Sequence, residues 1–170
     1  MKTLYIVRHA KSSWDDLSVS DHDRKLLPVG KKRTRKIAAQ LKKQGVFPDK
    51  MISSTAVRAY KTAKIIAKEL GYPADKVETT RALYGAGPDE VFDLLFAIPN
   101  TVESVMVVGH NPGFTDLVNL FLSENRQIDN LPTSAVACVQ FETEQWEKLP
   151  VSKHKTMFVL TPRQLKEKDF

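Results

Sequence analysis

The chain opens with the run TLYIVRH, which covers residues 3–9. Its first five residues are apolar or β-prone and hardly alternate with polar ones, a pattern typical of a strand buried on both faces. Such strands belong to parallel sheets that helices cover on both sides. The run therefore predicts an α/β fold in which Arg8 and His9 follow the carboxyl end of a buried strand.

Strand and helix signals alternate along the rest of the chain. We expect strands at residues 49–53, near Val77, at 104–108, at 135–141 and at 155–160, and helices from Pro28 to near Gly45, from about 56 to Gly71, from about Pro88 to Ala97 and after Pro112. This order predicts a three-layer α/β/α sandwich with a mostly parallel central sheet. No repeat or linker divides the sequence, so residues 1–170 are expected to form a single domain.

Smaller local features complete this outline. Ser54 or Thr55 is expected to cap the second helix, and Asn111 the helix that follows Pro112. Residues 142–154 resemble a turn, and the charged end from residue 165 to 170 is expected to fray. The single cysteine, Cys138, lies in an apolar run and is expected to be a buried thiol in a reducing compartment.

The composition is that of an ordinary globular protein, with 42% hydrophobic and 27% charged residues. The sequence contains no run of 18 apolar residues, and its start turns polar too soon for a signal peptide. We therefore expect a cytoplasmic protein without a membrane partner. The net charge of +6 suits phosphorylated ligands. The basic stretch Lys31–Lys36 is interpreted first as a solvated helix face, with an acidic partner or nucleic acid as weaker alternatives.

Three predicted strand ends carry side chains that suit an anion. The first strand leads into Arg8 and His9, the second leads through residues 53–55 to Arg58, and the strand at 104–108 leads to His110. In open α/β sheets, ligands bind beyond the carboxyl ends of the strands. Two arginines and two histidines without a carboxylate therefore predict an anion site.

A phosphoryl group matches this set of side chains. Guanidinium groups bind its oxygens, and a neutral imidazole is a competent nucleophile near neutral pH, so either His9 or His110 could attack. Any one of these residues alone also has an ordinary structural interpretation. The sequence has no metal-ligand motif, no serine-hydrolase elbow and no phosphate-binding glycine loop. His22 and His154 are expected to be surface residues.

These motifs resemble the histidine phosphatase (phosphoglycerate mutase-like) superfamily, and most closely the SixA-type phosphohistidine phosphatases. The resemblance implies that His9 is the nucleophile and becomes phosphorylated, that Arg8, Arg58 and His110 bind and stabilise the phosphoryl group, and that no cofactor or metal takes part. Asp21 and Arg24 are further candidates for substrate binding. The segments that carry the resemblance are VRHAKSSW at 7–14, SSTAVRA at 53–59, VGHNPG at 108–113 and PTSA at 132–135.

The sequence departs from many members of the family at the general acid. They carry a glutamate after a central strand, whereas residues 81–87 contain none. Asp89 and Glu90 are expected to be helix-capping charges, which leaves Asp21 as the better candidate for an acid or a water-positioning group. Phosphohistidine needs less help than a phosphate ester, because solvent can protonate the leaving ring nitrogen. The missing glutamate therefore favours phosphohistidine.

The sequence is compatible with several functions. The leading hypothesis is a phosphatase that acts through His9 on phosphohistidine in a phosphotransfer or phosphocarrier protein, with the basic first helix as a docking face. The alternatives are a phosphatase of small phosphomonoesters, a non-catalytic phosphate-binding module, and nucleic-acid binding through Lys31–Lys36. Mutase activity is not expected, since neither a proton-shuttling acid nor a lid is evident.

Overall fold

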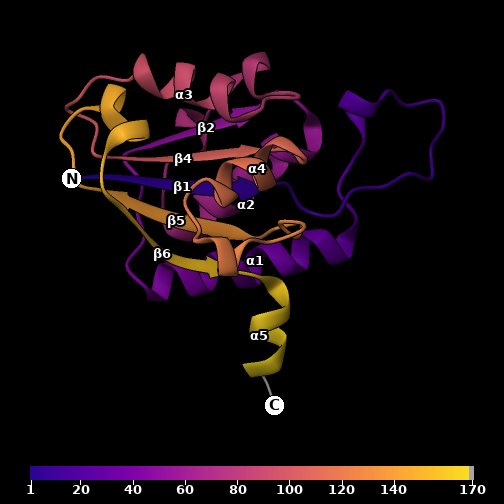
Figure 1. The fold of residues 1–170 in the computed structure, drawn as a ribbon. Coiled ribbons are helices and arrows are strands. Elements are labelled where there is room, and N and C mark those ends of the chain that lie inside the picture. Colours follow the sequence, from indigo (N-terminus) through magenta and orange to yellow (C-terminus); the bar gives the residue numbers. More distant parts are fainter. Residues whose placement is uncertain (169–170) are drawn as a thin grey trace.

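The computed structural model describes residues 1–168 and is built around a six-stranded sheet with the order β3-β2-β4-β1-β5-β6 (Figure 1). Every strand except β5 runs in the same direction, since β5 is antiparallel to both β1 and β6. The predicted mostly parallel α/β fold is confirmed. Residues 169 and 170, which the single-domain prediction included, lie outside the described residues. The strands are β1 (Lys2–Arg8), β2 (Lys50–Ser54), β3 (Glu78–Thr80), β4 (Ser104–Gly109), β5 (Val136–Phe141) and β6 (His154–Leu160).

Helices cover both faces of this sheet and complete the three layers (Figure 1). On one face lie α1 (Pro28–Lys43), α2 (Val57–Leu70) and α5 (Pro162–Lys168), and on the other lie α3 (Pro88–Phe96) and α4 (Gly113–Asn119). Strand β1 shows why the first run lacks alternation. Ile6 packs toward α3 and α4, whereas Val7 packs toward α1 and α2, and both side chains are fully buried.

The strand order brings the expected junctions together. Strand β4 lies between β1 and β2, with Arg8 opposite Gly109 and Ser53 opposite Val108. Because the three strands are parallel, the segments that follow them leave the sheet at one edge. His9 and His110 each follow directly at that edge.

Both predicted helix caps differ from the structure in position. The N-cap of α2 is Ala56, and the N-cap of α4 is Pro112, neither with a side-chain cap of its own. Asn111 still serves the first turn of α4, because its Oδ1 accepts from the Thr115 backbone N–H at 3.2 Å. The Ser54 hydroxyl instead accepts from the Ala56 backbone N–H at 3.1 Å, before the helix begins. Packing explains why residue 113 is a glycine, because a Cβ at this position would collide with the Ala86 carbonyl oxygen. A rule based on local sequence cannot predict that the Ala86 carbonyl lies against Gly113.

The C-terminal third contains structure that the sequence pattern did not show. The segment expected to be a turn includes a 3₁₀ helix at Trp146–Val151, with Trp146 fully buried in the core. Of the charged end that was expected to fray, residues 165–168 are helical, and residues 169–170 lie outside the described residues. Cys138 is buried as expected, and its burial raises the pKa of the thiol to about 11. None of the helices within residues 1–168 is long and apolar enough to cross a membrane.

Candidate active site

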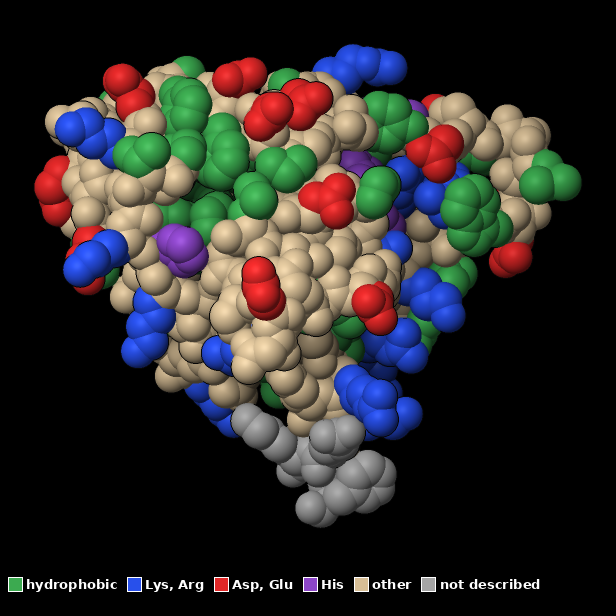
Figure 2. Space-filling model, in the orientation of Figure 1, with side chains coloured by type: hydrophobic (Ala, Val, Ile, Leu, Met, Phe, Trp, Pro, Cys, Tyr) green, Lys and Arg blue, Asp and Glu red, His purple; other side chains and the backbone are tan. Residues whose placement is uncertain are grey.

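Two buried histidines form the centre of a pocket at the carboxyl ends of β1 and β4. His9 is 7% exposed, His110 is 6% exposed, and their ring centroids lie 5.1 Å apart. The cavity measures about 270 Å³. Figure 2 shows histidine side chains close to lysine and arginine side chains on the right of this face. The described lining residues are Arg8, His9, Lys11, Ser12, Trp14, Arg24, Arg58, His110, Asn111 and Thr133.

The hydrogen bond of His9 defines which of its nitrogens carries a proton. Its Nδ1 lies 2.7 Å from the backbone oxygen of Ala10. A carbonyl oxygen only accepts, so Nδ1 must donate, and the neutral ring keeps a lone pair on Nε2. The pKa of His9 is lowered to about 3, mainly by burial and to a smaller extent by His110, Arg58 and Arg8, while the Ala10 hydrogen bond acts in the opposite direction. The Nε2 lone pair is therefore available at neutral pH.

Ser54 holds the second histidine. The Nε2 of His110 lies 2.8 Å from the Ser54 hydroxyl. Burial lowers the pKa of His110 to about 4, and the charge of Arg58 adds to this effect. Within residues 1–168, the buried nitrogens His110 Nδ1, Arg8 Nε and Arg58 Nε have no hydrogen-bond partner. Three unpaired donors or acceptors on residues of one pocket are what an oxyanion-binding site offers its ligand.

The arginines reach the pocket from different elements. Arg8 ends β1, and its Nη1 donates to the Leu131 backbone oxygen at 3.0 Å. Burial and the nearby Arg58 charge lower the pKa of Arg8. Arg58, in the first turn of α2, is 5% exposed and donates to Asp21 twice, to the backbone oxygen at 2.6 Å and to Oδ2 at 3.0 Å. The structure thus brings Arg8, Arg58, His9 and His110 together as the sequence led us to expect.

Asp21 and Arg24, the two weaker candidates, occupy different positions. Arg24 lines the pocket and donates from Nη1 to the Ser12 hydroxyl at 2.7 Å. Asp21 is not among the described lining residues, and accepts from Arg24 Nε at 3.1 Å as well as from Arg58. The Tyr84 hydroxyl, followed by Arg58 and Arg24, lowers the pKa of Asp21 to about 2. A carboxylate with that pKa carries no proton at neutral pH, and its contacts hold the guanidinium groups of Arg24 and Arg58.

Tyr84 is the site residue that sequence reasoning missed. Its hydroxyl donates to Asp21 Oδ2 at 2.5 Å, and its ring meets His110 edge-on at a centroid distance of 5.4 Å. His22, expected on the surface, is only partly exposed, because its Nε2 lies 2.8 Å from the Thr55 hydroxyl and its ring meets Tyr84 at 5.2 Å. The one available signal was position, since Tyr84 follows the predicted strand near Val77.

We expect Tyr84→Phe to loosen the Asp21–Arg58 pair while keeping the ring that packs on His110. The pKa of Asp21 should rise from about 2 toward its usual range, because the hydroxyl is the largest cause of the lowered value. Loss of one charge-assisted hydrogen bond should weaken inorganic phosphate binding about three- to tenfold. Carboxyl NMR titration and calorimetry measure the two effects. An unchanged Asp21 pKa would contradict this role.

Stability should depend on pH through the two buried histidines. Their folded pKa values of about 3 and 4 lie below the usual 6.5, so the unfolded chain binds protons that the folded protein does not as the pH falls below about 6.5. The free energy of unfolding should therefore decrease between pH 7 and 5, by about 2 kcal/mol for each histidine. Urea unfolding across this range measures it. His9→Gln should remove about half of the slope, and an identical slope in that variant would refute the assignment.

No group of three or more histidine, cysteine, aspartate or glutamate side chains in residues 1–168 is arranged to hold a metal ion. The mostly parallel sheet and this pocket define an α/β protein with a cluster of arginines and histidines at the carboxyl ends of β1 and β4. Residues 4–84 match the model of the histidine phosphatase superfamily (branch 1). An uncharacterized protein of Mycobacterium tuberculosis is 30% identical over 142 residues, which cover 79% of this chain and 86% of the relative.

Solved structures of histidine phosphatases and related enzymes resemble this chain. The chain is similar to the protein histidine phosphatase SixA complexed with tungstate, with 26% identity, a TM-score of 0.80 and coverage of 96% of this chain and 99% of that one. A mycobacterial glucosyl-3-phosphoglycerate phosphatase shares the fold at 14% identity and a TM-score of 0.65, over 95% of this chain and 99% of that one. The chain belongs to the histidine phosphatase superfamily and is SixA-like. It is a phosphatase, a hydrolase that acts on phosphate groups.

Proposed function

We propose that this phosphatase hydrolyses phosphohistidine in a partner protein, with His9 as the nucleophile. The observation that carries the proposal is the chemistry of the pocket wall. None of the described lining residues is a carboxylic acid, and the nearby Asp21 has a pKa of about 2. An alkoxide that leaves from a phosphate ester needs a proton from a positioned acid, a contribution worth about 10²–10⁴-fold. A leaving imidazole can take its proton from solvent.

The first chemical step transfers the phosphoryl group to His9. Its Nε2 lone pair attacks phosphorus, the bond from phosphorus to the substrate nitrogen breaks, and that nitrogen takes a proton from water. The Ala10 carbonyl supports this step by holding the Nδ1 proton, because it stabilises the positive charge that the ring gains. Arg8 and Arg58 have buried, unpaired Nε groups that suit the phosphoryl oxygens.

The second step returns the enzyme to its starting state. A water oxygen attacks phosphorus and the bond from phosphorus to Nε2 breaks. The attacking water releases a proton to solvent, which balances the proton that the first step took from water. His110 supports both steps, since a bound phosphoryl anion favours a protonated imidazole and opposes the burial that lowers its pKa to about 4. The Ser54 hydroxyl orients that ring through the contact at 2.8 Å.

The rim of the pocket favours a macromolecular substrate. Trp14 is 70% exposed, lines the pocket and lies against Arg24, whose guanidinium carbon is 3.5 Å from the ring centroid. Leu17, three residues further along the same loop, is 95% exposed. The exposed Trp14 at the pocket, and the exposed Leu17 on the loop that follows it, are suited to contact with a protein partner.

The test compares two peptides of one sequence that carry phosphohistidine or phosphoserine at the same position. We expect phosphate release from the phosphohistidine peptide with a kcat/KM at least about 100-fold higher, because only the serine ester needs the missing acid. Phosphoramidate serves as the minimal substrate with a nitrogen leaving group. Equal or faster hydrolysis of the ester would overturn the proposal.

Two alternatives predict other outcomes. The fold shared with the mycobacterial glucosyl-3-phosphoglycerate phosphatase favours testing small phosphomonoesters. Efficient turnover of one of them without turnover of either peptide would select that function. A non-catalytic module would bind phosphate and turn over none of these compounds.

A further inference from the structure

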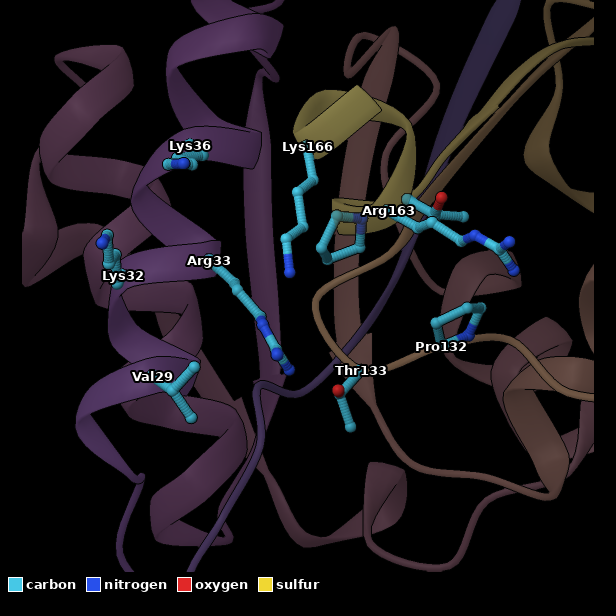
Figure 3. A pocket seen from close by; sticks show the side chains of 10 residues that line it. Val29, Lys32, Arg33, Lys36, Pro132, Thr133, Arg163 and Lys166 are labelled. Atoms are coloured by element: carbon cyan, nitrogen blue, oxygen red, sulfur yellow. The ribbon is translucent and has the colours of Figure 1, made fainter. Parts of the chain in front are cut away.

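A second cavity, lined by positive charge, lies between α1, α5 and the loop that precedes β5. Its volume is about 480 Å³. Five of the ten described residues that line it are lysine or arginine, and none is acidic. Figure 3 shows Arg33 of α1 and Lys166 of α5 reaching into the same space, near Thr133. We call it the basic cleft; its lining residues are Val29, Lys32, Arg33, Lys36, Pro132, Thr133, Thr161, Pro162, Arg163 and Lys166.

The basic cleft adjoins the catalytic pocket. Thr133 lines both cavities, so a chain that leaves the pocket past this residue enters the cleft directly. Figure 2 shows lysine and arginine side chains following one another down the right edge of this face, from the region of the histidines toward the end where Figure 1 places α5. The positive charge is therefore continuous with the site of the chemistry.

The fold divides the basic stretch of the first helix between two sides. Lys32, Arg33 and Lys36 line the basic cleft, whereas Lys31 and Arg35 line a separate groove between α1 and α2. That α1–α2 groove also holds five cations and measures about 550 Å³, with Lys61, Lys64 and Lys68 as its other basic residues. Among the residues described, it shares none with the catalytic pocket. The α1–α2 groove is therefore a matched control of equal charge.

We propose that the basic cleft binds an acidic segment of the partner protein, next to the phosphorylated residue that occupies the catalytic pocket. This inference rests on the proposed function, because it places the substrate's phosphohistidine at His9. Arg33 and Lys166 would attract carboxylates on that segment. Salt screens such attraction only weakly when the charges are within about 8–10 Å of each other. Because Thr133 joins the basic cleft to the catalytic pocket, the cations lie beside the phosphorylated residue of a protein substrate, which favours an acidic peptide segment over a nucleic-acid backbone.

The experiment uses two phosphohistidine peptides, one with glutamates and one with glutamines beside the phosphorylated residue. The test variant is Arg33→Glu/Lys166→Glu, and the control is Lys31→Glu/Lys61→Glu, which lowers the net charge by the same amount. We expect the test pair to raise KM for the acidic peptide about tenfold without changing kcat. Turnover of the glutamine peptide and of phosphoramidate should stay at the wild-type level, and the control pair should have little effect.

Several results would overturn the proposal. Equal increases of KM in both pairs would assign the effect to net charge, and no increase in the test pair would remove the cleft as a docking site. Binding of the unphosphorylated acidic peptide, followed by fluorescence anisotropy, separates docking from catalysis. If the protein binds the unphosphorylated acidic peptide but turns over none of the substrates, and the test pair weakens that binding, only the proposed function is refuted. No difference between the acidic and glutamine peptides would refute the docking inference alone.

Discussion

His9→Gln should lose at least about a thousandfold in kcat/KM for phosphoramidate and should form no phosphoenzyme. A glutamine amide can still donate toward the Ala10 carbonyl, but it has no lone pair that can attack phosphorus. Rapid-quench turnover and intact-mass measurement of acid-labile phosphate test both statements. This is the largest effect we expect from a single substitution, because it removes the bond-forming atom itself.

The control for this experiment is His154→Gln, an exchange of the same chemistry at an exposed position of β6. It should keep wild-type turnover, because the His154 ring packs on Phe121 and Phe141 and does not line the catalytic pocket. If His9→Gln still becomes phosphorylated and His110→Gln does not, the nucleophile is His110 and the proposed assignment is wrong.

Arg58→Lys should reduce kcat/KM by about 10²–10³-fold although the positive charge remains. Arg58 donates to Asp21 through Nη1 and Nη2, and its buried Nε has no partner within the described residues. A lysine ammonium cannot make the Asp21 contacts and also present a separate donor to the phosphoryl oxygens. Steady-state kinetics with phosphoramidate and the phosphohistidine peptide measure the loss, which should appear mainly in kcat.

Two further variants define the cause of that loss. Arg35→Lys, at an exposed position of α1, should behave like wild type. Asp21→Asn keeps the shape of the side chain but removes the charge that holds Arg58, so its loss should be smaller than that of Arg58→Lys. Wild-type turnover in Arg58→Lys would show that the geometry of the guanidinium is not needed.

Much of the fold was predictable because its signals are local. The buried run of β1 and the proline-initiated, amphipathic α1 depend on nearest neighbours and periodicity. The N-caps of α2 and α4 are Ala56 and Pro112, slightly later than predicted, because sequence signals locate a helix start only to within about one or two residues. The buried Trp146 was missed for a related reason, because a 3₁₀ helix has little periodicity to detect.

The sequence by itself determined which side chains could do phosphate chemistry. Hydrophobic patterns already place Arg8, His9 and His110 at strand ends and Arg58 at the start of the helix after the second strand, and the motifs around them indicate the superfamily. Their catalytic roles remain predictions until the variants are measured. The absence of a glutamate in residues 81–87 was equally visible in the sequence.

Only the tertiary structure decided how these groups are held and where a partner could dock. Asp21 is 37 residues from Arg58 and 63 from Tyr84 in the chain, yet one carboxylate joins both. The basic stretch of α1 is divided between two cavities, and only one of them adjoins His9. Contacts between distant segments depend on strand order and helix packing, and local sequence patterns carry no information about which segments will meet.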